Sequence, residues 1–320
     1  MEINEEGKRV LLNLAQHYDA WLEATRLIAR GRLAWKASGG KDYLYRIVDR
    51  QGNGTSLGPR STATEALHAD YERARHGQAQ TGTQLATDHA IYRALRLPQP
   101  PSFIGAALRE LDVRGLLGSA YLVVGTSALS AYAIETGTIL PTELSATADL
   151  DVTWIATGGA PEPNALFAAL KAADGTYAVN TERPFQLRNA RGEEVELLLP
   201  ASLAGRWSSA EKLHPVPLPE QDWLLKGRPI THVVCDLGGG AARLVVPDPR
   251  WYALHKLWLA DKPGRSRLKV DKDRAQGATL LDLVADRMPH YPLDDAFRGE
   301  LPTELRPYFD SWATRRRVKG

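Results

Sequence analysis

Two aspartates separated by a single leucine are the residues whose types and spacing best suit metal chemistry. Asp149 and Asp151 alternate with Leu150 and Val152 in residues 148–154. Residues two apart in a strand point to the same face, so the two carboxylates project together while the apolar side chains face the core. Two adjacent carboxylates repel each other unless a cation lies between them. The pattern therefore favours a site for Mg²⁺ or Mn²⁺, which prefer oxygen ligands, over a solvated acidic strand face.

A second acidic pair lies in a later segment, residues 194–200, whose other positions are mostly apolar. If this segment is a strand beside the first, Glu194 or Glu196 brings a third carboxylate to the metal ions. Three carboxylates around two ions would activate an attacking oxygen and neutralise the charge of a triphosphate. Both glutamates share one face, so periodicity alone does not choose between them, and either could instead be a surface residue of a hairpin.

A glycine and two hydroxyl residues follow the apolar strand predicted at residues 121–124. Gly125 lets a phosphate approach the backbone closely, and Thr126 and Ser127 open a helix whose free N–H groups favour anions. The same pattern is also typical of an ordinary strand-to-helix turn with a serine or threonine cap. By itself the turn is weak evidence for a phosphate site.

Together, these three segments resemble the signature of the polymerase-beta-like nucleotidyltransferase superfamily. That signature is a hydrophobic residue, Gly and Gly/Ser/Thr-Ser, then a helix, an acidic-hydrophobic-acidic strand and a later third acid. The resemblance aligns Glu196, rather than Glu194, with the third acid, at a position where the superfamily more often has Asp. The matching segments are residues 124–127, 149–151 and 195–197.

The chain is also similar to bacterial stand-alone nucleotidyltransferase-like proteins that carry an N-terminal hairpin domain. The segments that carry this resemblance are residues 35–36, 40–45, 56–61, 64–65, 249–256 and 272–273. The metal-binding and catalytic residues that it implies are Asp149, Asp151 and Glu196. The nucleotide-binding residues that it implies are Gly125, Thr126, Ser127 and Lys256. Lys269 and Lys272 are weaker phosphate candidates, and His255 is expected to be a packed or surface histidine.

The implied function is transfer of a nucleoside monophosphate from an NTP to an acceptor. The acceptor could be the 3′ end of a tRNA, a protein or a small molecule. One alternative is a catalytically silent nucleotide-binding or interaction protein of a defence or toxin–antitoxin system, which the retained pair Asp149 and Asp151 disfavours. Another is a metal-dependent phosphodiesterase or nuclease, which the phosphate-type turn ahead of the acids disfavours.

Strands and helices alternate around these segments, which indicates an α/β (α+β) fold with a small mixed sheet. The expected strands are residues 121–124, 150–155, 185–188 and 194–199, and the expected helices are 104–114, 128–135, 164–173, 251–260 and 272–287. We predict a nucleotidyltransferase core at residues 98–249 and a C-terminal helical region at 250–320. The resemblance implies an inserted loop at 136–148, because the gap from Ser127 to Asp149 is longer than the commonest spacing of the superfamily.

The predicted N-terminal domain, residues 1–97, is a helix, a hairpin and a second helix. The first helix is expected at residues 10–29 and the second from about residue 62 to just before Gly77, with possible boundaries at 78–84 and 98–101. Aromatic residues beside basic ones in the hairpin could stack on nucleic acid. The favoured interpretation is that they form the core of a small domain. These residues are Trp35, Lys36, Tyr43, Tyr45 and Arg60.

The composition is that of an ordinary globular protein, with 320 residues, 43% hydrophobic and 24% charged, and a net charge of +2. The charge is too small to indicate a nucleic-acid partner by itself. The single cysteine, Cys235, excludes an intrachain disulfide and is expected to be a buried strand thiol. No signal-like apolar run or membrane-spanning stretch is evident, so a cytoplasmic protein without a membrane partner is expected.

Overall fold

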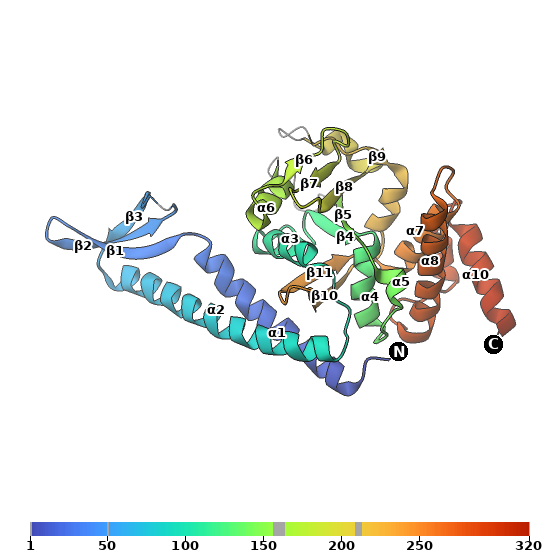
Figure 1. Cartoon of the computed structure of the whole chain (residues 1–320), viewed down its shortest axis with the longest axis horizontal. Helices are drawn as coiled ribbons and strands as arrows, with labels where there is room; N and C mark the ends of the chain where they lie inside the picture. The colour runs from blue at the N-terminus through green and yellow to red at the C-terminus, as the bar shows by residue number, and fades with distance from the viewer. Residues whose placement is uncertain (1, 50, 156–163, 209–212, 320) are drawn as a thin grey trace.

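The computed structural model describes residues 2–49, 51–155, 164–208 and 213–319. An elongated arm, formed by the N-terminal part of the chain, projects from a mixed α/β body, and the C-terminal helices lie on the opposite side of that body (Figure 1). The predicted α/β class with a mixed sheet and helical flanks is confirmed. In the part of the chain that the structure describes, no helix is long and apolar enough to cross a membrane.

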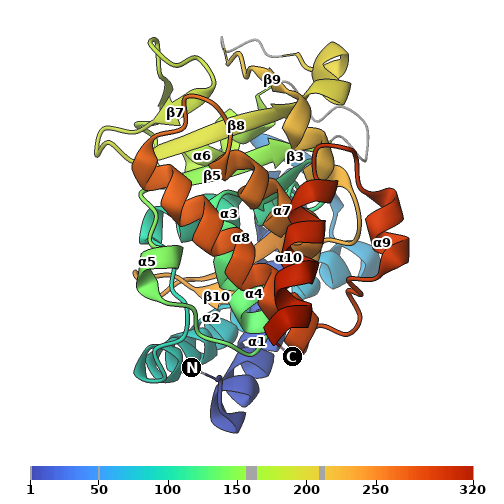
Figure 2. The same cartoon turned by 90° about the vertical axis from the view of Figure 1, so that its right-hand side faces the viewer.

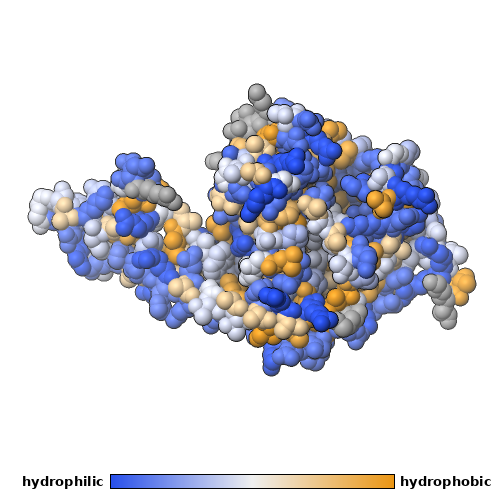
Figure 3. All heavy atoms as spheres, in the orientation of Figure 1, coloured by the Kyte–Doolittle hydropathy of each residue, from blue (hydrophilic) through white to orange (hydrophobic). Residues whose placement is uncertain are grey.

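The arm contains the predicted helix, hairpin and second helix, and adds a third strand to the hairpin. Strands β1 and β2 pair in antiparallel fashion, and β3 continues the sheet after a bulge between Leu44 and Tyr45. In Figure 3 this projecting sheet is covered mainly by hydrophilic residues. The elements are α1 (Glu5–Ile28), β1 (Arg32–Ser38), β2 (Lys41–Ile47), β3 (Gly54–Pro59) and α2 (Thr62–Ala94).

Helix α2 is longer than the sequence pattern predicted. The expected end before Gly77 and the possible boundary at 78–84 are wrong, because the helix continues without a break to Ala94. Its inward face repeats at alternating steps of three and four residues, the spacing of a two-helix coiled coil. Several inward positions are polar or small. At one of them, the Gln78 amide donates a hydrogen bond to Thr25 Oγ1 (2.9 Å). Because a polar stripe of this kind contains few hydrophobic residues, the spacing of hydrophobic residues alone does not reveal the helix. The inward positions are Tyr71, Ala74, Gln78, Thr81, Leu85, Asp88 and Tyr92.

The hairpin aromatics pack largely against the arm itself. Leu44 is fully buried, and the Trp35 ring lies 5.8 Å from the His68 ring of α2. The Arg60 guanidinium lies over the Trp35 ring, 5.1 Å from its centre, and Lys36 lies over the Tyr45 ring at 4.9 Å. For Trp35, this packing agrees with the small-core interpretation.

A buried carboxylate ties the arm to the body. Asp112, at the end of α3 (Ser102–Val113), accepts hydrogen bonds from Tyr18 (3.0 Å) and Arg26 (3.2 Å) of α1. It also accepts one from Arg243 (2.9 Å) of β11. β11 (Ala241–Val246) pairs with β10 (Ile230–Cys235) in a hairpin that the sequence reading did not predict. Cys235 is a fully buried thiol in β10, as expected.

The central sheet has the order β4-β5-β8-β7-β6, and β9 pairs with β8. Strands β4 and β5 are antiparallel, β5 and β8 are parallel, and β8, β7 and β6 are antiparallel to one another in turn. The predicted hairpin between β7 and β8 is confirmed. The strands are β4 (Tyr121–Val124), β5 (Asp149–Trp154), β6 (Ala178–Val179), β7 (Gln186–Arg188), β8 (Glu194–Pro200) and β9 (Pro217–Leu218).

The C-terminal helices α7, α8 and α10 lie together at one side of the body, in front of the sheet in Figure 2. The predicted loop at 136–148 contains a short helix, α5, and α8 begins five residues before the helix expected from residue 272. The division into domains at 97/98 and 249/250 stays a prediction. The helices of the body are η1 (Thr126–Ala128), α4 (Leu129–Glu135), α5 (Thr142–Ser145), α6 (Ala165–Ala173), η2 (Ala201–Arg206), η3 (Pro219–Leu225), α7 (Pro249–Ala260), α8 (Arg267–Arg287), α9 (Asp295–Glu300) and α10 (Arg306–Lys319).

Candidate active site

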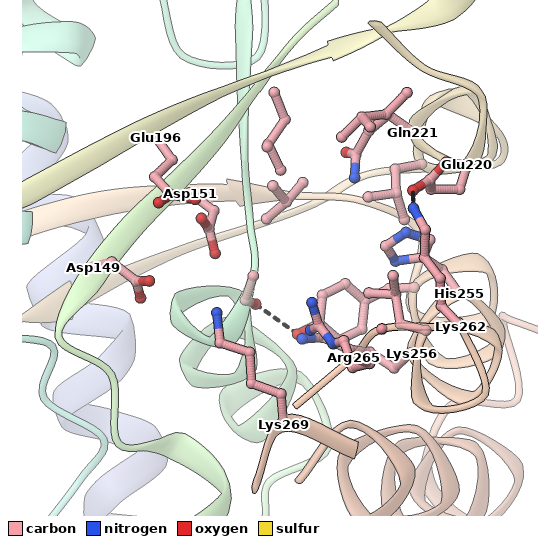
Figure 4. Close-up of a pocket in the computed structure, with 18 of the residues that line it drawn as sticks. Asp149, Asp151, Glu196, Glu220, Gln221, His255, Lys256, Lys262, Arg265 and Lys269 are labelled. Atoms are coloured by element: carbon pink, nitrogen blue, oxygen red, sulfur yellow. Dashed lines mark hydrogen bonds and ion pairs between the residues drawn. The ribbon is translucent and has the colours of Figure 1, made fainter. Parts of the chain in front are cut away.

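A cavity of about 350 Å³ opens between the central sheet and the C-terminal helices. The carboxylates of Asp149, Asp151 and Glu196 line one side of it (Figure 4). In β5 the two aspartates are half-buried, whereas Leu150 and Val152 between and beside them are fully buried. The alternation expected from the sequence is therefore present, and it places both aspartates on the cavity side of the strand.

The pairing of β5 with β8 decides which glutamate joins them. The two strands are parallel, with Asp151 opposite Glu196 and Asp149 opposite Glu194. Glu196 lines the cavity, and Glu194 is not among the residues that do. The Gln186 side chain donates to both glutamates, at 3.1 Å from Glu194 and 3.0 Å from Glu196. Glu194 also lies 3.6 Å from the Arg188 guanidinium, which directs it toward the neighbouring strand.

Gly125 is in contact with the second aspartate. Its backbone has φ +62° and ψ −160°, a region that essentially only glycine adopts. A Cβ atom at this position would lie 1.8 Å from Asp151 Oδ2, so any side chain would displace the carboxylate. The Tyr252 hydroxyl of α7 donates to the Gly125 carbonyl at 2.6 Å and so connects the turn to the C-terminal helices.

The two hydroxyl residues of the turn lie less close to the cavity than Gly125. Gly125 and Val124 line it, and neither Thr126 nor Ser127 does. The Ser127 hydroxyl is buried without a hydrogen-bond partner among the described residues. The Thr126 hydroxyl is 3.4 Å from the Gln276 amide of α8. Phosphate binding by Thr126 and Ser127 stays a prediction.

The three carboxylates are held close together at a cost in free energy. Burial, followed by the negative charges of Asp149 and Glu196, raises the pKa of Asp151 from its ordinary value of 3.8 to about 7. Burial also raises the pKa of Glu196, and the hydrogen bond from Gln186 partly opposes this shift. Among the described residues none donates a hydrogen bond to Asp151, whereas Asp149 accepts one from Thr147 (2.6 Å). The Asp151 carboxylate is thus half-buried, crowded by like charge and without a donor among the described residues.

Basic side chains lie across the cavity from these acids. Lys256 lines the cavity, but it is buried and its ammonium pairs with Asp273 of α8 at 2.9 Å. Arg265, in the loop between α7 and α8, pairs with the same carboxylate, so two cations share one acid. Nucleotide binding by Lys256 stays a prediction. Lys269 extends from the first turn of α8 toward the acids (Figure 4). It forms no hydrogen bond or ion pair with another residue that the structure describes.

The sequence pattern did not show which of these cations face the acids. Lys269, one of the two weaker phosphate candidates, lines the cavity, and its charge lowers the pKa of Asp151 and of Glu196. Lys272 instead donates to the Ala146 carbonyl (2.5 Å) of the inserted segment. Arg265 was not considered, since it belongs to no recognised motif. No local signal marks it, because it reaches Asp273 from the loop before α8 only through tertiary packing.

The donor set of the acidic side suits a divalent cation of the Mg²⁺ type. All three side chains offer oxygen, and a cation would relieve the repulsion that raises the pKa of Asp151. Within the described ranges, no group of three or more acidic, histidine or cysteine side chains is arranged to hold a metal ion. Mg²⁺ commonly retains water and binds through one or two carboxylates together with substrate phosphates. The residues that could hold it here are Asp149, Asp151 and Glu196.

We predict that Asp151→Asn stabilises the metal-free protein in a pH-dependent manner. The folded-state pKa of about 7 exceeds the unfolded value near 3.8, so the wild type loses stability as the pH rises through this window. The asparagine variant avoids this loss, which at about 1.4 kcal/mol per pKa unit amounts to roughly 2–4 kcal/mol at pH 8. Denaturant unfolding in the presence of a chelator at pH 5 and pH 8 would measure it.

The exposed Asp271→Asn on α8 is the control for removal of an acidic charge. It should change the free energy of unfolding little at either pH, because its side chain is not buried. An Asp151→Asn variant that is no more stable than the wild type at pH 8 would contradict the assigned environment of this carboxylate.

The comparisons with known proteins address the same part of the chain. A family described as Nucleotidyltransferase matches residues 102–302, which is more than half of the chain and contains every residue that lines the cavity. No curated protein and no solved structure matches the chain. The matched region excludes nearly all of the arm and includes both the central sheet and the helices α7 and α8. On this evidence the chain belongs to the nucleotidyltransferase family.

Proposed function

We propose that the protein transfers a nucleoside monophosphate from an NTP to an acceptor in a reaction that depends on Mg²⁺ or Mn²⁺. The observation that carries the proposal is the polarity of the cavity, which has three carboxylates on one side and basic side chains on the other. A nucleoside triphosphate with its divalent cation needs both kinds of group in one place. Family membership supports the same general activity.

The acidic side would hold the cation, and Asp149, Asp151 and Glu196 are its proposed ligands. A divalent cation bound there would neutralise phosphate charge and make the attacking hydroxyl more acidic. The proposed role of the protein is to hold the three carboxylates in register before substrate arrives. Their placement on paired, buried strands limits how far they can move.

The basic side would bind the triphosphate. Lys269 lines the cavity, and its ammonium group has no hydrogen-bond or ion-pair partner among the described residues. It is therefore the cation best placed to contact a phosphate oxygen. Lys256 and Arg265 share Asp273, which leaves them with a net positive charge between them. Preorganised cations of this kind stabilise the negative charge that builds up during phosphoryl transfer.

In the proposed reaction, the oxygen of an acceptor hydroxyl forms a bond to the α-phosphorus. The bond between the α-phosphorus and the oxygen that bridges to the β-phosphate breaks, and pyrophosphate leaves. The hydroxyl proton passes to a carboxylate of the site. The acceptor can be the 3′ end of an RNA such as tRNA, a protein or a small molecule, and the geometry of the cavity does not favour one of these.

The direct test is incubation of the protein with each α-³²P-labelled NTP, Mg²⁺ and a cell extract. We expect label to become attached to an acceptor, whose class is then identified by digestion with ribonuclease or protease. Chelation of the metal or the substitution Asp149→Ala should abolish labelling. Glu143→Ala, which removes an exposed acid on α5, should leave it intact. Nucleotide binding without any transfer would instead favour the catalytically silent alternative.

The two glutamates of β8 should differ in their effect on turnover. Glu196→Gln removes a charge from the cavity side, so we expect turnover to fall by about a hundredfold or more. Glu194→Gln removes the same charge from a residue held by Arg188 and Gln186 outside the cavity, and its effect should be small. Both variants are to be compared at saturating Mg²⁺ after their folding has been checked by circular dichroism. The opposite ranking would assign the third ligand to Glu194.

Gly125→Ala should abolish transfer because the new methyl group would occupy the position of the Asp151 carboxylate. Gly137→Ala is the control, since Gly137 also has a positive φ (+63°) but nothing lies within 4 Å of its would-be Cβ. It introduces backbone strain of roughly 1–2 kcal/mol without a clash. We expect the control to keep its turnover with a lowered melting temperature. Equal turnover in both variants would show that close contact with Asp151 is not needed.

A further inference from the structure

The end of the cavity opposite the acids contains buried polar groups without partners. His255 of α7 is 4% exposed, and neither of its ring nitrogens has a hydrogen-bond partner among the described residues. Gln221 of η3 is also 4% exposed, and its Oε1 lacks a partner in the same part of the chain. Both residues line the cavity. Buried polar atoms are rarely left unpaired, and several at one place indicate a ligand that completes them.

The two side chains lie on one side of the cavity, away from the carboxylates. Figure 4 shows Gln221 and His255 on the opposite side of the cavity from Asp149 and Asp151. The His255 ring is fixed by an edge-on contact with the Trp223 ring, with centres 6.3 Å apart. The cavity is also lined by leucine side chains. They are Leu198, Leu218, Leu224 and Leu259.

The chemistry of these groups suits a neutral ligand better than a phosphate. Burial, and then the positive charges of Lys256, Arg265 and Lys262, lower the pKa of His255 to about 3, so the ring is neutral. A neutral imidazole has one N–H donor and one acceptor nitrogen, and Gln221 Oε1 is a second acceptor. Phosphate oxygens at neutral pH offer no donor to either acceptor. An occupant that presents donors and acceptors together would pair with all of these atoms.

A nucleobase meets this description. Its ring faces are apolar, and its edge carries N–H donors beside nitrogen or oxygen acceptors. A neighbouring cation is already neutralised, because Lys262 pairs with Glu220, which also suits an uncharged ligand. We propose that His255 and Gln221 form the nucleobase subsite of the donor NTP and determine which base is preferred. This inference rests on the proposed function, in which the triphosphate lies between the carboxylates and the basic side chains of the same cavity.

The test compares Kd values for ATP, GTP, CTP, UTP and inorganic tripolyphosphate in the presence of Mg²⁺, measured by calorimetry. The wild type should bind at least one NTP more tightly than tripolyphosphate and should distinguish among the four bases. His255→Phe and Gln221→Leu should each weaken binding of the preferred NTP by about tenfold, the effect of losing a hydrogen bond to a buried partner. Both should leave the Kd for tripolyphosphate unchanged. His214→Phe, which makes the same change at an exposed histidine outside the cavity, should alter none of these values.

A second measurement separates recognition from a structural role. Without nucleotide, both variants should melt at or above the wild-type temperature, because each removes buried polar atoms that have no partner. Lower melting temperatures with unchanged base preference would overturn the inference, as would parallel losses of affinity for NTP and tripolyphosphate. A wild type that binds all four NTPs no better than tripolyphosphate would overturn the subsite and leave the proposed function standing. A wild type that binds none of these probes would overturn both.

Discussion

Strands β5 and β8 run parallel with Asp151 opposite Glu196, and this register determines the rest of the site. The acidic side chains do not stabilise this register, because like charges on neighbouring strands oppose pairing. Burial of Val152, Val195 and Leu197 on the opposite faces of the two strands compensates for this repulsion. Each such side chain contributes about 1.5–3 kcal/mol on burial. A shift of one residue would turn these side chains toward the cavity and the acids toward the core.

The C-terminal helices complete the site through buried polar contacts rather than through a large apolar surface alone. Asp273 of α8 accepts from Lys256 of α7 and from Arg265 of the loop between them. A buried ion pair adds little net stability, but removal of one partner leaves an uncompensated charge. The triad therefore specifies how α7 and α8 lie relative to each other. That in turn sets where Lys269 and His255 lie along the cavity.

The sequence pattern predicted features that depend on residues close together in the chain. Alternation within residues 149–152 was enough to place both aspartates on one face, and the resemblance selected Glu196, which lines the cavity. Residues from other elements, such as Arg265 and Gln221, reach the cavity only through tertiary packing, and no local period marks them. The β10–β11 hairpin was missed although its strands are strongly apolar. The continuous helix α2 was missed because polar and small residues occupy its inward positions.

The polar stripe between α1 and α2 has a consequence for how stability is distributed along the chain. Contacts such as Gln78 with Thr25 and His17 with Asp88 (2.6 Å) fix the alignment of the two helices but gain little from the hydrophobic effect. Between Tyr71 and Leu85, no inward side chain of α2 is a buried apolar one. Segments with few buried apolar contacts open at a lower free energy than the core of the same protein. We therefore expect the part of the arm between Tyr71 and Leu85 to open at a lower free energy than the body that contains the cavity.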